Sequence, residues 1–287
     1  MSPRPISVEH DGLHLAALDW GGSGEDLLLL HPNGLCAGFF HPLAERLTDT
    51  FRVVGIDLRG HGASDAPPSR EGLAYRAMAR DVVAVLDALG IGEFAALGES
   101  LGGGVGAVVD QEAPGRMRHL VLCEAIAFDA TAFPRDAQPG EGGTGNAMAD
   151  MTRARRAVWP DRATVRARYA SRTPFDVVAP EALDAYLRWG FSDLADGRVE
   201  LACAPETEAT IYEVSAGATG SPVAFAHLPA MQGRVTVTHG DASYLPEEWF
   251  QAQADAARTV LRTIAGGHFF LQEDTARGEA LVREVLG

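Results

Sequence analysis

The stretch FAALGESLGG, residues 94–103, decides the fold of this chain. Phe94 to Gly98 is typical of a buried strand, and a helix is expected to begin just after Ser100. A serine hydroxyl is a weak nucleophile, so it must be exposed and paired with a base before it can react. The two glycines of G-x-S-x-G allow a strained turn that lifts the serine clear of the sheet. The pattern therefore predicts a nucleophilic Ser100, in preference to a serine that merely caps a glycine-rich turn.

Two backbone N–H groups are candidates for an oxyanion hole, the set of donors that stabilises a developing negative charge on oxygen. The Leu101 N–H lies at the start of the predicted helix, where the helix dipole favours negative charge. A second donor is expected from the loop after an early strand, and residues 31–34 (HPNG) have that position. Pro32 has no N–H, so Asn33 is the predicted donor, with a simple β-turn as the alternative.

A histidine near the end of the chain is the candidate general base. Gly266 and Gly267 precede His268 and follow a predicted strand, so they let the loop turn inward and present the imidazole over the sheet. Other histidines have structural explanations, because His61 lies in a turn and His239 lies in a strand pattern. His268 is therefore the predicted base.

Apolar runs and amphipathic stretches alternate along the first half and predict a parallel sheet covered by helices on both faces. Residues 148–218 are mainly helical in pattern and contain no strong strand, and a polar, glycine-rich loop, 134–146, precedes them. The expected organisation is an α/β core over residues 1–128, a helical cap insertion over 129–230 and the rest of the core over 231–287. Predicted strands comprise 26–31, 52–57, 94–98, 119–123, 234–239 and 258–264; helices are expected around 78–89 and 281–286.

The composition and net charge of the chain limit the classes of binding partner that we expect. The 287 residues carry a formal net charge of -15, so a phosphate backbone would repel the chain and nucleic acid is not an expected partner. A basic run at residues 153–156 with further arginines to 168 is interpreted as a solvated helix face. Three separated cysteines, Cys36, Cys123 and Cys203, suggest neither a disulfide framework nor a metal site. No membrane-spanning run or signal peptide is apparent, so a cytoplasmic protein without metal or organic cofactor is expected, of open oligomeric state.

Taken in order, four motifs resemble those of the α/β-hydrolase superfamily over nearly the whole chain. They are HPNG at 31–34, DLRGHGASD at 57–65, GESLGG at 98–103 and GGHFF at 266–270. The resemblance implies an α/β-hydrolase fold, with a mostly parallel central sheet, flanking helices and a helical cap. It also implies that Asp57 and Arg59 are structural loop residues. The motifs say almost nothing about the substrate.

The acid that should orient the histidine departs from the superfamily's pattern. In the superfamily it usually follows the penultimate strand, but Ser243 and Tyr244 stand where the aspartate is expected, and Asp241 comes immediately after the glycine. Glu124 ends an earlier predicted strand, in a segment similar to one branch of haloalkane dehalogenases that uses a glutamate there, as some fungal lactone hydrolases also do. Segment 268–274 (HFFLQED) resembles that branch too. Glu124 is therefore the preferred acid and Asp241 the alternative.

The reaction cannot be that of a dehalogenase, because those enzymes attack with an aspartate and this chain has Ser100. The expected activity is hydrolysis of a carboxylic ester or lactone, with a small apolar molecule as the substrate. Carbon–carbon bond hydrolysis of the meta-cleavage-product type, a transferase, and a ligand receptor that retains a slow triad remain alternatives. Four cap aromatics could line the pocket, although aromatics in helical patterns are more often core: Trp159, Phe175, Trp189 and Phe191.

Overall fold

A computed structural model describes residues 2–130 and 146–287 and contains an eight-stranded sheet in the order β1-β2-β4-β3-β5-β6-β10-β11. The strands from β4 to β11 are parallel, whereas β1 pairs antiparallel with β2, and β2 pairs antiparallel with β4. This is the mostly parallel sheet that the sequence predicts. Its strands are β1 (Arg4–His10), β2 (Leu13–Gly21), β3 (Glu25–Leu30), β4 (Phe51–Ile56), β5 (Phe94–Glu99), β6 (Met117–Cys123), β10 (Arg234–Gly240) and β11 (Leu261–Ile264).

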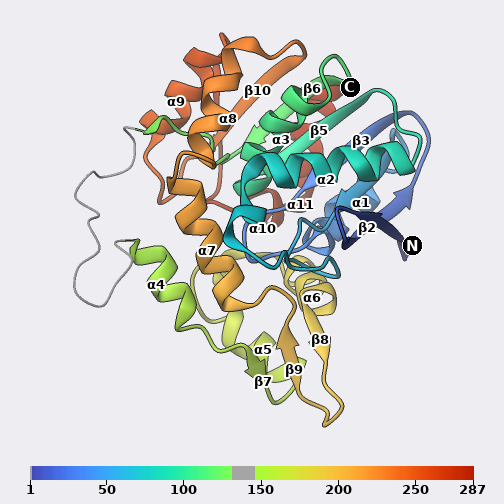
Figure 1. Ribbon diagram of the computed structural model, residues 1–287, viewed down its shortest axis with the longest axis vertical. Helices are drawn as coiled ribbons and strands as arrows, with labels where there is room; N and C mark the ends of the chain where they lie inside the picture. Colours follow the sequence, from blue (N-terminus) through green and yellow to red (C-terminus); the bar gives the residue numbers. More distant parts are fainter. Residues whose placement is uncertain (1, 131–145) are drawn as a thin grey trace.

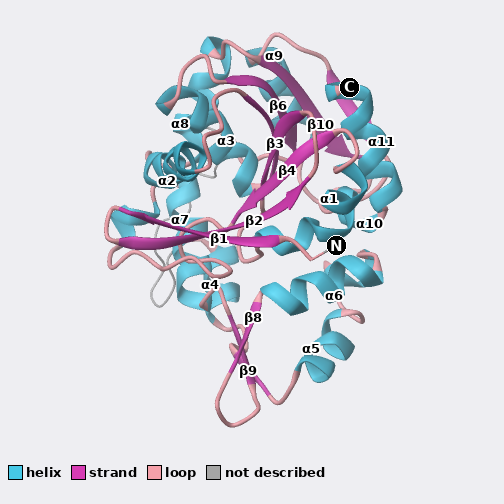
Figure 2. Cartoon of the chain, turned by 90° about the vertical axis from the view of Figure 1, so that its right-hand side faces the viewer, coloured by secondary structure: helices cyan, strands magenta, loops and turns pink. Residues whose placement is uncertain are grey.

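Helices cover both faces of this sheet, which confirms the expected α/β-hydrolase architecture (Figure 2). On one face α2, α3 and α8 pack together, and on the other α1 packs against α11. The helices are α1 (His41–Leu47), α2 (Tyr75–Ala88), α3 (Leu101–Glu112), α8 (Ser221–His227), α9 (Glu247–Ala256), α10 (Phe270–Glu273) and α11 (Thr275–Leu286). Short 3-10 helices lie at Ala37–Phe40, Arg70–Leu73, Phe175–Val177 and Leu228–Ala230.

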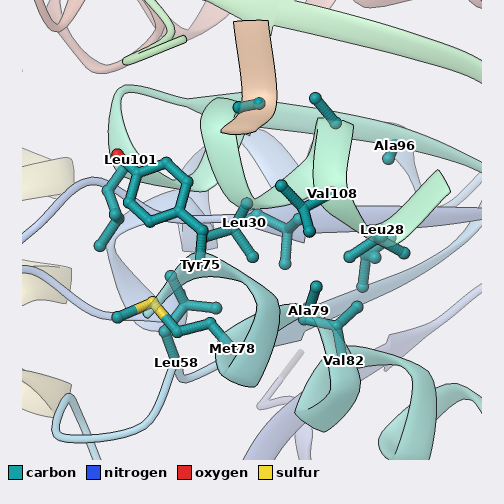
Figure 3. Close-up of a cluster of buried hydrophobic side chains, with 14 of the residues drawn as sticks. Leu28, Leu30, Leu58, Tyr75, Met78, Ala79, Val82, Ala96, Leu101 and Val108 are labelled. Atoms are coloured by element: carbon teal, nitrogen blue, oxygen red, sulfur yellow. The ribbon is translucent and has the colours of Figure 1, made fainter. Parts of the chain in front are cut away.

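Apolar spacing explains how α2 attaches to the sheet. Met78 and Val82 recur on one side of the helix and are fully buried against Leu28 and Leu30 of β3 (Figure 3). The Leu101 side chain joins the same core, so the first residue of α3 is anchored in the interior. Burying such a side chain stabilises the fold by about 1.5–3 kcal/mol. The helix that follows Ser100 is thereby fixed to the sheet at its first turn.

A second group of elements, which we call the cap segment (residues 146–216), lies below the sheet in Figure 1. The sequence predicted a mainly helical segment without a strong strand, and it did not predict the small antiparallel sheet that β7, β8 and β9 form. These strands have only two or three residues each, too few to show an alternating pattern. The elements are α4 (Ala147–Arg153), β7 (Val158–Trp159), α5 (Arg162–Tyr169), α6 (Pro180–Trp189), β8 (Phe191–Asp193), β9 (Val199–Leu201) and α7 (Pro205–Ala216).

Other differences from the sequence prediction lie at the ends of the sheet. The β1–β2 hairpin was not predicted, and β11 starts three residues later than expected, at Leu261. The predicted loop at 134–146 lies, except for Asn146, outside the described residues. Within the described ranges, no helix is both long and apolar enough to cross a membrane. The division into core and cap at residues 129 and 230 stays a prediction.

Candidate active site

Ser100 sits at the sharp turn between β5 and α3 with φ 54° and ψ −118°, a strained backbone for a residue with a side chain. The flanking glycines make this turn possible. A Cβ on Gly98 would lie 2.6 Å from the Gly102 carbonyl oxygen, and one on Gly102 would lie 2.1 Å from that of Leu30. Hydrogen bonds to β6 and to the segment after it hold the turn. The Ser100 N–H donates to the Cys123 carbonyl, and the Ser100 carbonyl accepts from the Ile126 N–H. The strain is thus supported on both sides.

His268 and Glu124 form a buried pair. The Nδ1 of His268 lies 3.0 Å from Oε2 of Glu124, and these two side chains are almost completely shielded from solvent. With Nδ1–H donating to the carboxylate, Nε2 is the nitrogen left to take up a proton. This is the arrangement that a general base and its orienting acid require.

The carboxylate of Glu124 is held by further donors. Its Oε1 accepts from the Gly240 N–H at 2.7 Å and its Oε2 accepts from the Ser243 hydroxyl at 2.6 Å. His239 lies close by, with Nε2 3.8 Å from Oε1. Ser243 occupies the position where the superfamily's aspartate was expected. Here its hydroxyl supports the glutamate instead, a role that the sequence analysis missed.

Asp241 is used differently. Its Oδ1 accepts a hydrogen bond from the Gly266 N–H at 2.9 Å, and the residue is exposed. It therefore stabilises the loop that carries His268. Described hydrogen bonds and ion pairs link His268 with Glu124 and none links it with Asp241.

Strand order explains why Glu124 reaches the histidine. β5, β6, β10 and β11 are successive neighbours in the sheet, and parallel strands end at the same edge. Ser100 follows β5, Glu124 follows β6 and His268 lies in the loop after β11. A positive φ of 50° at Glu124 turns the chain at the end of β6. Glu124 thus follows the strand that lies next to the strand before Ser100.

The loop at residues 31–35, which we call the oxyanion loop, carries the predicted donor Asn33. The Leu101 N–H is the first of α3 and has no acceptor within the helix. No described residue accepts a hydrogen bond from the Asn33 N–H either. The side chain of Asn33 is engaged, since its Nδ2 donates to the Glu208 carbonyl at 3.0 Å. Both predicted donors are therefore unused within the described chain.

Two buried histidines, His31 and His61, hold the oxyanion loop in place through hydrogen bonds. His61 Nε2 accepts from the Gly34 N–H at 3.0 Å, and His31 Nε2 accepts from the Leu58 N–H at 3.0 Å. The two rings meet edge to face. Burial lowers the pKa of His61 to about 4 and that of His31 well below its usual value, so both rings are neutral. Nearby, Asp57 accepts from the Ala37 and Ala63 N–H groups, in line with the structural role implied for it.

Because these buried histidines are neutral, we expect the stability of the fold to decrease at acidic pH. Because the folded pKa of His61 lies below the unfolded value of 6.5, its contribution to stability is complete above pH 6.5 and is lost as the pH falls toward 4. Between pH 6.5 and 5 the loss is about 2 kcal/mol for this group. Urea unfolding at several pH values measures it. His61→Gln should flatten the dependence on pH and His14→Gln, at a partly exposed position of β2, should not. Equal slopes in both variants would contradict the assignment.

A cluster of polar side chains from the cap segment contacts the oxyanion loop. We call it the polar cluster, and it consists of Arg155, Tyr169, Tyr186 and Glu208. Tyr186 donates from its hydroxyl to the Gly34 carbonyl at 3.1 Å, and the Glu208 carboxylate lies directly over the Cα of Gly34. Arg155 pairs with Glu208 and also donates to the Tyr169 hydroxyl at 3.1 Å. The sequence analysis missed this cluster, because its members are far apart in the chain.

Because the polar cluster lies against Gly34, we expect any side chain at position 34 to destabilise the fold. Gly34 has φ +76°, and a Cβ there would come within 2.5–2.8 Å of the Glu208 carboxylate. We expect Gly34→Ala to lower stability by about 1–3 kcal/mol from backbone strain and to lower kcat further by displacing Asn33. Gly12→Ala is the matched control, since Gly12 has φ +75° and open space around it. Thermal unfolding and kcat of the two variants are compared; an equal loss of kcat in both would contradict the role of the cluster.

The basic run forms the predicted solvated helix face only in part: Arg166 and Arg168 are exposed on α5, whereas the arginines at 153–156 are arranged differently. α4 ends at Arg153, so Arg155 and Arg156 lie beyond it. Arg153 pairs with Glu206 at 2.9 Å and with Glu213 at 2.7 Å, and Arg155 joins the polar cluster. The acidic partners come from α7, 50 or more residues later, which is why local charge pattern gave no sign of them.

The four predicted pocket aromatics are packed within or beside the cap segment. Phe175 stacks on Tyr186 with ring centroids 5.5 Å apart and also contacts Phe269, the neighbour of His268. Trp159 and Phe191 are buried in the same cluster, whereas Trp189 lies against His41 of α1. Contact of these residues with a substrate stays a prediction. In the described ranges, no group of three or more His, Cys, Asp or Glu side chains is placed to hold a metal ion.

Comparison with known proteins places the chain in a family. The family model described as alpha/beta hydrolase fold matches residues 27–177. The chain belongs to the α/β-hydrolase family. A putative carbamate hydrolase, RutD, from Caulobacter vibrioides is 36% identical to this α/β hydrolase over 115 residues, which cover 39% of the chain and 42% of RutD. The first curated relatives are matched over only 30% to 42% of their length.

Solved structures extend the likeness to the whole chain. E-2-(acetamidomethylene)succinate hydrolase has a TM-score of 0.80 and 19% identity, over 99% of this chain and 100% of that one. Est816, described as an N-acyl homoserine lactone degrading enzyme, has a TM-score of 0.72 and 22% identity, over 98% of this chain and 100% of that one. At these identities the likeness shows the fold of the α/β hydrolase.

Proposed function

We propose that this α/β hydrolase cleaves a carboxylic ester or lactone through an acyl-enzyme on Ser100. The observation that carries the proposal is the buried contact between His268 Nδ1 and Glu124 Oε2, at the sheet edge where the strained Ser100 turn also lies. A strained serine, an oriented imidazole and two unused N–H groups are the parts that acyl transfer needs.

In this mechanism the Ser100 oxygen attacks the substrate carbonyl while His268 Nε2 takes the hydroxyl proton. The N–H groups of Leu101 and Asn33 donate to the resulting oxyanion. His268 returns the proton to the leaving alcohol, and the acyl group stays on Ser100. Water, deprotonated by His268, then attacks the acyl-enzyme. The bond between the acyl group and Ser100 breaks, His268 returns the proton to the Ser100 oxygen, and the acid is released. Glu124 holds the tautomer of His268 and stabilises the imidazolium.

The test is a panel of p-nitrophenyl esters and lactones of increasing acyl length, extended by vinylogous diketones and repeated with an added alcohol or amine. It is read out by steady turnover and by intact mass of the rapidly quenched protein. Turnover together with an acyl adduct mapped to Ser100 is the expected result. Three results would overturn the proposal in favour of an alternative. One burst without steady turnover indicates a receptor, turnover confined to vinylogous diketones indicates carbon–carbon cleavage, and acyl transfer that requires an added alcohol or amine indicates a transferase.

A further inference from the structure

A buried pair of side chains that the mechanism does not use lies next to Ser100 in the chain. Glu99 is the last residue of β5 and is fully buried, and Gln272 of α10 is 1% exposed. Nε2 of Gln272 donates to Oε2 of Glu99 at 2.8 Å. Since Glu99 precedes Ser100 and Gln272 follows His268 by four residues, this bond joins the nucleophile's segment to the base's segment.

Two oxygens of this pair have no donor. Among the described residues, nothing donates to Oε1 of Glu99 or to Oε1 of Gln272, although both atoms are buried. A buried acceptor without a donor destabilises the fold, and does so more strongly if it carries charge. A proton on Oε1 of Glu99 would convert one acceptor into a donor. Acid and amide would then face each other with two hydrogen bonds, N–H to Oε2 and O–H to the amide oxygen, and both oxygens would be satisfied.

The charges around Glu99 favour the same state. Glu124 and Glu273 are the charged groups that face it, and both repel a second negative charge; the Cys123 thiol also lies near. Burial above all, and then these two carboxylates, raise the pKa of Glu99 well above its usual range, while the Gln272 hydrogen bond opposes the shift. Neither neighbour offers Glu99 a positive charge.

We propose that Glu99 is a neutral carboxylic acid in the folded protein and that its doubly hydrogen-bonded pairing with Gln272 positions the His268 loop against the Ser100 turn. Glu99 is a positioning residue, because it acts through the backbone segments on either side of the site. Its neutrality also leaves the charge that faces His268 on Glu124.

Infrared difference spectroscopy tests the protonation directly. Wild type at neutral pH should show the C=O stretch of a protonated carboxylic acid, and Glu99→Gln should remove it. Two matched variants should keep the band: Glu93→Gln at an exposed surface site, and Glu124→Gln, which changes the other carboxylate. Absence of the band in wild type, as expected for an ionised Glu99 hydrated by a buried water, would overturn the proposal, and so would its persistence in Glu99→Gln.

The stability of the same variant gives a second arm. A carboxyl whose pKa is raised on folding contributes stability that is complete at low pH and is lost as the pH rises from the unfolded pKa through the folded one. The folding equilibrium constant of Glu99→Gln relative to wild type should therefore grow by up to tenfold per pH unit above about pH 4.5. A ratio independent of pH would contradict a protonated Glu99.

A kinetic arm, which alone rests on the proposed function, tests positioning. Glu99→Leu should lower kcat on a turned-over ester with little change in KM, and Glu99→Gln, whose amide can pair with Gln272, should recover most of that loss. Equal losses in the two variants would refute the positioning role. If no ester is turned over, the proposed function fails, whereas the infrared and stability arms still decide the protonation of Glu99.

Discussion

Replacing Ser100 with alanine is expected to lower kcat on the ester or lactone substrates by about a millionfold. The reason is that the proposed attack needs the Ser100 hydroxyl at the turn between β5 and α3, where the backbone has φ 54°. Some rate above the uncatalysed reaction should survive, since the N–H groups of Leu101 and Asn33 would still bind a developing oxyanion. Substrate binding should change far less than kcat.

Steady-state kinetics and intact mass measure this loss. Ser171→Ala is the matched control, because Ser171 is exposed in the cap segment and its hydroxyl donates to the nearby Arg168 carbonyl. It should retain the wild-type rate and the acyl adduct. Turnover by Ser100→Ala at more than one percent of the wild-type rate would exclude Ser100 as the nucleophile.

The second large effect is expected for Glu124→Gln, which should lower kcat by about 10⁴-fold. An amide in place of the carboxylate cannot stabilise the imidazolium, and it can present its N–H₂ to His268 and select the wrong tautomer. The amide must also replace an acceptor of the Gly240 N–H and the Ser243 hydroxyl, so some loss of stability is expected too. Thermal unfolding separates this loss from the effect on kcat.

Asp241→Asn is the comparison that decides the acid. Asparagine keeps an oxygen that can accept from the Gly266 N–H, so the His268 loop should hold and kcat should fall by less than about tenfold. If Asp241→Asn instead removed the activity while Glu124→Gln kept it, the acid would be Asp241, and the contact between Glu124 and His268 would be structural only.

The sequence was most informative where local geometry alone dictates the structure. G-x-S-x-G after an apolar run predicted the strained turn at Ser100, because few residue patterns tolerate that backbone. Runs such as 94–98 and 119–123 predicted the parallel strands β5 and β6, since a strand buried on both faces is continuously apolar. Gly90, at φ +66°, follows the end of α2 as its pattern predicted.

Features that depend on contacts between distant residues could not be derived in the same way. The pairing of Arg155 with Glu208, 53 residues later, cannot be predicted from the local periodicity of the sequence. The same holds for Ser243, whose hydroxyl reaches Glu124 across the sheet edge, 119 residues away. For the acid, the sequence offered two carboxylates, and only the order of the strands shows why Glu124 lies against His268. β7, β8 and β9 are too short to have a pattern at all.

The attachment of the oxyanion loop to the cap segment has a consequence for the order of events in a catalytic cycle. Asn33 bonds to the Glu208 carbonyl, and the Gly34 carbonyl accepts from Tyr186, so the loop is tied to two cap helices. Any opening that carried α6 and α7 away as a unit would break both ties. Such an open form could keep Ser100, His268 and Glu124 intact and still fail to stabilise an oxyanion. Closure would then act as an interlock, which permits bond cleavage only while the substrate is enclosed.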